Sequence, residues 1–153
     1  MIDNSIYTEY KCKKCGWTTH KQTVCKKCGS TEVYEHCDED VEQIRLIQWT
    51  KRNLDECGDL FGLFAIANGG HRHIATASRL KLSGVKPGVP DLMLPVSRHG
   101  KHGLFIEMKR KDGGQLSNHQ RNWALFLRNQ NYACVKANGF EEAKAILKKY
   151  LGF

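Results

Sequence analysis

Two Cys-x-x-Cys pairs near the start of the chain carry its most specific chemical pattern. Cys12 and Cys15 form the first pair, Cys25 and Cys28 form the second, and a glycine directly follows each pair. Four thiolates in this spacing suit a structural Zn²⁺ ion, and the glycines permit the tight turns that bring two sulfurs onto one metal. The spacing predicts a zinc ribbon, in which the metal stabilises a segment too small to fold around a hydrophobic core.

Two lysines separate the cysteines of each pair, and Trp17 follows the first pair. The four lysines are Lys13, Lys14, Lys26 and Lys27. Exposed basic and aromatic side chains favour contact with nucleic acid, but these lysines also offset the negative charge of a four-thiolate zinc site. The sequence leaves both interpretations open: a ribbon that contacts DNA or a partner, and a ribbon that only holds its own segment together.

Two acids and a lysine in the second half of the chain form another chemical cluster. Asp91 begins one apolar segment, and Glu107 and Lys109 end the next. If these segments form an antiparallel hairpin centred near His99, Asp91 lies opposite Glu107. Side chains two residues apart on a strand share a face, so Glu107 and Lys109 project together while Met108 points into the core.

Carboxylates that meet at the end of a strand supply the oxygen ligands that Mg²⁺ and Mn²⁺ prefer. A lysine beside such a metal orients an attacking water or stabilises charge developing on phosphorus. The Glu-x-Lys triplet alone indicates nothing, because the chain also contains Glu9-Tyr-Lys11 and Glu142-Ala-Lys144. The competing interpretation is a surface ion pair on an exposed hairpin. The apolar residues before Glu107 disfavour it, because a buried charge needs compensating partners.

Hydrophobic periodicity and turn residues divide the remaining chain into the elements that must position these groups. The expected order is a helix at 38–57, a core strand at 60–67, a turn at 68–70, a short basic helix at 71–82, strands at 91–96 and 103–109, a helix at 117–129, a strand at 132–137, and a last helix capped by Asn138 with Glu141 three residues on. This order predicts an α/β fold with a mixed sheet flanked by helices. We place the zinc ribbon at residues 1–37 and the larger domain at residues 38–153.

The charge of the chain favours a polyanionic partner. The 153 residues include 24 Lys and Arg against 16 Asp and Glu, which gives a net charge of +8. By charge alone, a soluble basic surface explains this value equally well. The longest apolar run, at 60–67, is far shorter than the roughly 20 residues of a membrane-spanning helix. The first residues lack the pattern of a signal peptide. We therefore expect no membrane association and a reducing, cytoplasmic location.

Several segments of the larger domain form a recognisable set of motifs. They are residues 84–95 with Asp91, residues 103–110 with Glu107 and Lys109, Leu116-Ser-x-x-Gln120, residues 64–70, and Glu39-x-x-Glu42-Gln43 with Trp49 downstream. Together they resemble the VRR-NUC family of PD-(D/E)xK nucleases, over about residues 38–151. The resemblance implies a core like that of restriction endonucleases. The stand-alone members are mostly from phages and bacteria, which implies a bacterial or phage-infected host cell.

The resemblance also assigns roles within the acidic cluster. Asp91, Glu107 and the backbone carbonyl of Met108 would bind the catalytic Mg²⁺ or Mn²⁺, and Lys109 would orient the attacking water. By this resemblance the chain is a metal-dependent DNA endonuclease that acts as a homodimer on branched DNA such as Holliday junctions. The alternatives are a nicking or restriction-like nuclease of linear duplex DNA and a non-catalytic zinc-ribbon DNA-binding protein.

Two further positions match the family with competing explanations. The family has an additional acid on its first helix, and Glu39 and Glu42 both qualify. Glu39 is preferred because Gln43 follows it by one helical turn, whereas either acid also suits the first turn of a helix. Gln120 matches the glutamine of the family motif, but Ser117-x-x-Gln120 is also the spacing of a capping box.

A set of basic and polar residues is expected to contact DNA phosphates. Taken one at a time, the basic residues also fit an ordinary solvated surface, and the asparagine fits a plain turn. The set comprises Asn68, His71, Arg72, Arg79, Lys86, Arg110 and Lys111.

Overall fold

A computed structural model describes residues 9–19, 24–31, 33–36, 39–66 and 79–153. The larger domain contains a four-stranded sheet whose strands follow the order β4-β5-β6-β7. These strands are β4 (Phe64–Ala65), β5 (Leu92–Leu94), β6 (Leu104–Lys109) and β7 (Ala133–Asn138). Neighbours from β4 to β6 are antiparallel, and β7 runs parallel to β6. The expected mixed sheet is confirmed.

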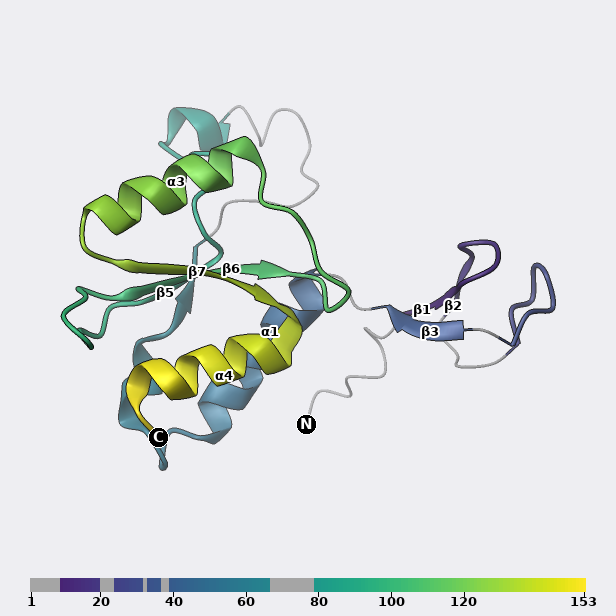
Figure 1. The fold of residues 1–153 in the computed structure, drawn as a ribbon, viewed down its shortest axis with the longest axis horizontal. Coiled ribbons are helices and arrows are strands. Elements are labelled where there is room, and N and C mark those ends of the chain that lie inside the picture. Colours follow the sequence, from purple (N-terminus) through teal and green to yellow (C-terminus); the bar gives the residue numbers. More distant parts are fainter. Residues whose placement is uncertain (1–8, 20–23, 32, 37–38, 67–78) are drawn as a thin grey trace.

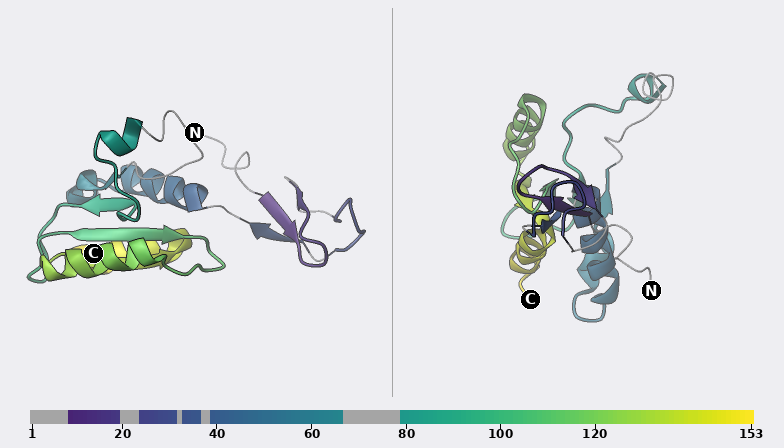
Figure 2. Two further views of the ribbon diagram at one scale, coloured as in Figure 1. Left: turned by 90° about the horizontal axis from the view of Figure 1, so that it is seen from above. Right: turned by 90° about the vertical axis from the view of Figure 1, so that its right-hand side faces the viewer.

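Helices cover both faces of this sheet (Figure 1). They are α1 (Glu39–Arg52), α3 (Asn118–Asn129) and α4 (Gly139–Leu151). Figure 1 shows α3 above the sheet and α1 with α4 below it, and the turned view on the right of Figure 2 agrees. A 3₁₀ helix, η2 (Gly58–Gly62), follows α1, and residues 79–82 are helical. The predicted helices at 117–129 and after Asn138 are therefore confirmed within one residue.

The expected strand at 60–67 is largely wrong. Residues 58–62 form the 3₁₀ helix, and the strand that follows has only two residues, Phe64 and Ala65. The tight turn lets the apolar run serve two environments, because Leu60 and Leu63 enter the core while Phe61 is 84% exposed. A continuous apolar run of this length does not by itself distinguish a buried strand from a helical turn.

The end of the first helix and the capping of the last helix differ from expectation. The first helix ends at Arg52 rather than near Cys57, because the side chain of Asn53 donates to the carbonyl of Trp49 and a turn follows. At the start of α4, Asn138 makes no side-chain cap. Its backbone amide instead donates to Oε2 of Glu142 at 2.8 Å, so Glu142 rather than Glu141 completes this terminus.

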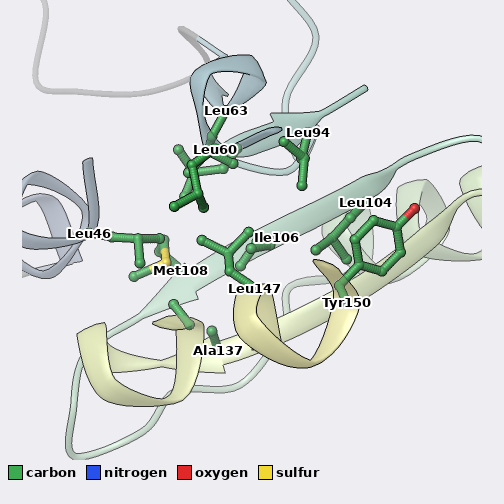
Figure 3. Packing of buried hydrophobic residues seen from close by; sticks show 12 residues of the cluster. Leu46, Leu60, Leu63, Leu94, Leu104, Ile106, Met108, Ala137, Leu147 and Tyr150 are labelled. Atoms are coloured by element: carbon green, nitrogen blue, oxygen red, sulfur yellow. The ribbon is translucent and has the colours of Figure 1, made fainter. Parts of the chain in front are cut away.

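The main core lies between the sheet and the pair α1 and α4 (Figure 3). Ile106 and Met108 point from β6 toward Leu46 of α1 and Leu147 of α4, and all four side chains are at most 1% exposed. A smaller cluster lies under α3, where Phe105 of β6 packs beside Leu127. The alternation along β6 leaves Glu107 and Lys109 on the α3 side, as the period of two predicted.

The N-terminal segment forms a separate three-stranded antiparallel sheet beside the larger domain (Figures 1 and 2). Its strands, in the order β2-β1-β3, are β1 (Glu9–Cys12), β2 (Thr18–Thr19) and β3 (Val33–His36). Among the described residues, no helix is both long and apolar enough to cross a membrane.

Candidate active site and metal centre

The register of the β5–β6 hairpin brings Asp91 next to Glu107. Leu92 pairs with Ile106 and Leu94 with Leu104, so Asp91, directly before β5, faces Glu107 across the ladder. This is the register expected for a turn centred near His99. Oδ2 of Asp91 accepts a hydrogen bond from the backbone amide of Met108 at 2.8 Å, which fixes the carboxylate against the end of β6.

Glu107 and Lys109 form a buried ion pair on the α3 side of β6. Their Oε1 and Nζ atoms lie 2.8 Å apart, and each residue is only 5% exposed. Gln120 also donates to Oε1 of Glu107 from α3. The second oxygen of Glu107, Oε2, is buried and has no partner among the described residues. A buried carboxylate oxygen without a donor is unfavourable, so this atom is a ready ligand for a cation.

Gln120 fits both of the interpretations left open by its sequence context. Its Oε1 accepts from the backbone amide of Ser117 at 2.8 Å, and the Ser117 hydroxyl accepts from the amide of Gln120 at 3.2 Å. This is a complete capping box. The same cap holds the other end of the Gln120 amide against Glu107.

The two candidate acids of α1 occupy different environments. Oε1 of Glu39 lies 3.4 Å from Nζ of Lys109, so Glu39 joins the acidic cluster. Glu42 is 2% exposed and turns away from it. Oε2 of Glu42 accepts from the amide of Phe140 at 2.5 Å, at the start of α4, and its Oε1 meets Arg45 at 3.4 Å. Glu42 thus joins α1 to the positive end of the α4 dipole.

The concentration of negative charge shifts the pKa values of the cluster. Burial, and then the charges of Asp91 and Glu39, raise the pKa of Glu107 to about 7 against the hydrogen bond from Lys109. Burial likewise raises the pKa of Asp91 despite its bond to the Met108 amide. Burial lowers the pKa of Lys109, but the hydrogen bond and charge of Glu107 outweigh it and raise that pKa above its usual value. The cluster therefore holds excess negative charge at neutral pH, which a divalent cation would neutralise.

Two glycines that support the cluster were not among the predicted site residues. A Cβ atom on Gly114 would lie 2.8 Å from Cδ of Lys109, so this residue leaves room for the lysine side chain. Nζ of Lys136 donates to the Gly114 carbonyl at 3.1 Å and holds the loop in place. A Cβ atom on Gly88 would lie 2.6 Å from the carbonyl carbon of His119. The glycine pair 113–114 so soon after Lys109 was the available sequence signal for the first of these contacts.

The expected phosphate contacts divide into two groups. Asn68, His71 and Arg72 lie outside the described residues. Arg79, Lys86 and Lys111 are exposed, and Arg110 is half-buried. The guanidinium of Arg110 lies 3.7 Å from the carboxylate of Asp112.

The four cysteines of the N-terminal sheet converge as their spacing predicts. The Sγ atoms of Cys12, Cys15, Cys25 and Cys28 all lie within 4.8 Å of one another. Two of the Sγ separations, Cys12 to Cys28 and Cys15 to Cys25, are 3.6 Å. Four thiolates at about 2.3 Å from one tetrahedral ion are about 3.8 Å apart, so the cluster is close enough to hold a metal ion.

Equivalent hydrogen bonds form both turns of this cluster. The amide of Gly16 donates to the carbonyl of Cys12 at 2.9 Å, and that of Gly29 donates to Cys25 at 2.8 Å. Both glycines have a φ near +70°, a conformation that side chains other than glycine rarely adopt. The turn expected after each cysteine pair is confirmed.

The family comparison agrees with this arrangement. The model of the VRR-NUC domain matches residues 33–141 of the 153 in the chain. The chain belongs to the VRR-NUC family. A solved structure described as a "VRR_NUC domain protein" is 25% identical, with a TM-score of 0.63, and the similarity covers 75% of this chain and 88% of that chain. A comparison with curated proteins finds no match. The VRR-NUC domain is a nuclease domain, and it implies DNA as the substrate.

Proposed function

We propose that this VRR-NUC protein is a Mg²⁺- or Mn²⁺-dependent DNA endonuclease. The observation that carries the proposal is the unpartnered, buried Oε2 of Glu107 beside Asp91 and Lys109. Most buried carboxylate oxygens in structural ion pairs accept a hydrogen bond, whereas a metal site requires an oxygen that is free to coordinate the ion.

The donor set fits a hard divalent cation. Asp91 and Glu107 supply carboxylate oxygens, and Met108 adds a backbone carbonyl. The amide of Met108 points toward Asp91, past the end of β5, and in a strand the carbonyl of a residue faces the same side as its amide. A bound Mg²⁺ would polarise the phosphodiester and lower the pKa of the attacking water.

The remaining residues of the cluster hold and orient the reacting groups. Lys109 is a donor without acceptor lone pairs, so its ammonium would hold the attacking water and stabilise charge on the phosphate. Glu39 and Glu107 keep that ammonium at the strand end, at 3.4 Å and 2.8 Å. Gln120 fixes the orientation of the Glu107 carboxylate from α3.

The family resemblance supports two finer parts of the proposal. Branched DNA, such as a four-way junction, would be the substrate, and the protein would act as a homodimer. A twofold dimer would present two sites to opposed strands of a symmetric junction. A monomer on DNA would instead favour a nicking enzyme.

In this proposal the N-terminal module binds Zn²⁺ and contributes further contacts to DNA phosphates. Tetrahedral thiolate coordination selects zinc among common divalent ions. The four lysines within the two cysteine pairs are exposed, and Nζ of Lys27 lies 5.4 Å from the ring centroid of Trp17. These side chains form a basic surface suited to a DNA backbone.

The test is a cleavage panel of single strands, linear duplex, flaps and four-way junctions with Mg²⁺ or Mn²⁺. We expect Lys109→Ala to abolish cleavage while DNA binding stays nearly intact, because one charge among many contributes little to affinity. Lys144→Ala is the matched control, because Lys144 belongs to the same sequence pattern, Glu142-Ala-Lys144, but lies on a helix. This variant should cleave DNA like the wild type.

The acids should give a complementary result. Asp91→Asn and Glu107→Gln should abolish cleavage. Without Mg²⁺ or Mn²⁺ they should bind DNA at least as tightly as the wild type, because each removes negative charge that would face a phosphate. Ca²⁺ should strengthen binding by the wild type without supporting turnover. Full cleavage by Lys109→Ala would contradict the assignment of the active site to this cluster. No cleavage by the wild type on any substrate would contradict the nuclease proposal and favour a zinc-ribbon DNA-binding protein.

A further inference from the structure

An open aromatic hollow lies beside α3. It has a volume of about 280 Å³ and is lined by Lys86, Asn122, Trp123 and Phe126. Phe126 is 52% exposed, whereas Trp123 is half-buried and packs against the small cluster beneath α3. The volume is near the lower end of ligand pockets, about 300 Å³. The nuclease chemistry proposed above uses none of these four side chains except Lys86, as a phosphate contact.

The side chains of the hollow suit a flat, uncharged ring attached to a phosphate. The rings of Trp123 and Phe126 meet edge to face, with centroids 5.6 Å apart and an interplanar angle of 87°. Nζ of Lys86 lies 5.9 Å from the centroid of the Trp123 ring. Proteins that hold single-stranded nucleic acid combine the same two features, which are aromatic faces for the bases and cations for the backbone.

Two residues that line the hollow, Trp123 and Lys86, are close in sequence to residues that contact the acidic cluster or support it. Trp123 follows Gln120 by three residues, so the two lie on one side of α3 and about 4.5 Å apart along its axis. Lys86 precedes Gly88 by two residues, and Gly88 packs on the backbone of His119 and Gln120. The lining of the hollow therefore adjoins the residues that hold Glu107.

We propose that this hollow binds an unstacked nucleobase of the DNA beside the acidic cluster. The inference rests on the proposed function and specifies its substrate. In a continuous duplex each base is stacked and paired, so filling the hollow there costs unstacking energy. At a branch, a flap or an unpaired nucleotide this cost is small, and the protein therefore selects DNA with unpaired bases.

The test compares two DNAs in buffer without Mg²⁺ or Mn²⁺, where binding is measured without cleavage. One is a linear duplex, and the other is the same duplex with one unpaired 2-aminopurine nucleotide. We expect the wild-type protein to bind the second DNA more tightly than the first. Binding should also change the fluorescence of the 2-aminopurine in that DNA. Phe126→Ala should reduce that preference by about fivefold or more, the lower limit for loss of one stacked base. Lys86→Gln should weaken it as well.

Leu125→Ala is the matched control, because Leu125 is 61% exposed on the same helix and does not line the hollow. It should leave the preference unchanged. Equal affinity of the wild type for both DNAs, or an equal effect of Leu125→Ala and Phe126→Ala, would overturn the inference. Dissociation of a dimer by Phe126→Ala in sedimentation would also overturn it, by assigning the hollow to a second copy of the chain. Because binding is measured without Mg²⁺ or Mn²⁺, the inference can fail while cleavage persists, and it can hold if cleavage is never found.

Discussion

The acidic cluster should make the metal-free protein less stable as the pH rises through neutrality. Burial and neighbouring carboxylates raise the pKa of Glu107 from 4.5 to about 7 in the folded chain. Below pH 4.5 the carboxyl is protonated in both the folded and the unfolded chain. Between pH 4.5 and about 7 the unfolded chain releases this proton while the folded chain retains it. The free energy of unfolding therefore falls across this window.

The pKa difference sets the size of the effect. At 1.36 kcal/mol per pH unit, the interval from 4.5 to about 7 corresponds to at most about 3.4 kcal/mol. Solvent screening at the half-buried Asp91 and the exposed Glu39 reduces the expected loss to about 2 kcal/mol. Lys109 stays protonated throughout, because its pKa is raised above the usual lysine value. In Glu107→Gln the titrating group is absent, so this variant should gain stability over the wild type by about 2 kcal/mol between pH 4.5 and 7.5.

The assay is urea denaturation of the wild type and Glu107→Gln at pH 4.5, 6 and 7.5 in buffer without Mg²⁺ or Mn²⁺. The difference between the two proteins isolates the contribution of Glu107. Glu141→Gln is the control, because it removes a carboxylate that is exposed on α4. Added Mg²⁺ at pH 7.5 should stabilise the wild type more than Glu107→Gln, since a ligand of the folded state raises the free energy of unfolding. A difference that is independent of pH, or that grows in the opposite direction, would refute the electrostatic account of this site.

Three other predictions separate stability from activity. Glu42→Ala should lower the free energy of unfolding by about 2 kcal/mol, because the amide of Phe140 loses its buried acceptor. Glu39→Ala should change the free energy of unfolding by less than about 0.5 kcal/mol and should instead reduce cleavage. Equal urea midpoints for the two variants would contradict this division. Gly114→Ala should reduce cleavage severalfold at nearly unchanged DNA affinity, because the added methyl displaces the Lys109 side chain, and wild-type kinetics would exclude that contact. Elemental analysis should find about one Zn²⁺ per chain. Removal of this ion by a chelator should unfold the N-terminal sheet. Freely reactive thiols in the folded protein would count against the zinc site.

Patterns that depend on a few neighbouring residues could be interpreted from the sequence. A Cys-x-x-Cys-Gly turn closes within five residues and brings its two sulfurs together. Because zinc takes four such ligands, two turns of this kind predicted one four-sulfur site. The period of two along a strand placed Glu107 and Lys109 on one face and Met108 in the core. The polar turn around His99 set the register that brings Asp91 opposite Glu107.

The role of each acid on α1 depends on contacts that no local pattern encodes. Glu39 and Glu42 are both suitable first-turn acids, and they differ only in what the folded chain brings beside them. Lys109, which meets Glu39, is 70 residues away in the sequence, and Phe140, which meets Glu42, is 98 residues away. The same holds for Gln120, whose amide caps its own helix and also reaches Glu107 across the sheet.

The shape of the apolar run at 60–67 was likewise beyond local inference. Its hydrophobicity was sufficient to predict that the segment is buried. It could not distinguish a strand from a 3₁₀ turn, because either structure can bury both Leu60 and Leu63. The 3₁₀ turn forms because Leu60 and Leu63 must both reach a core already bounded by α1 and β5, while Phe61 remains outside. The sequence alone therefore predicted which groups would carry out the proposed chemistry and on which strands they lie. The packing of distant segments determined which carboxylate faces the lysine, because burial and charge at the site come from several elements at once.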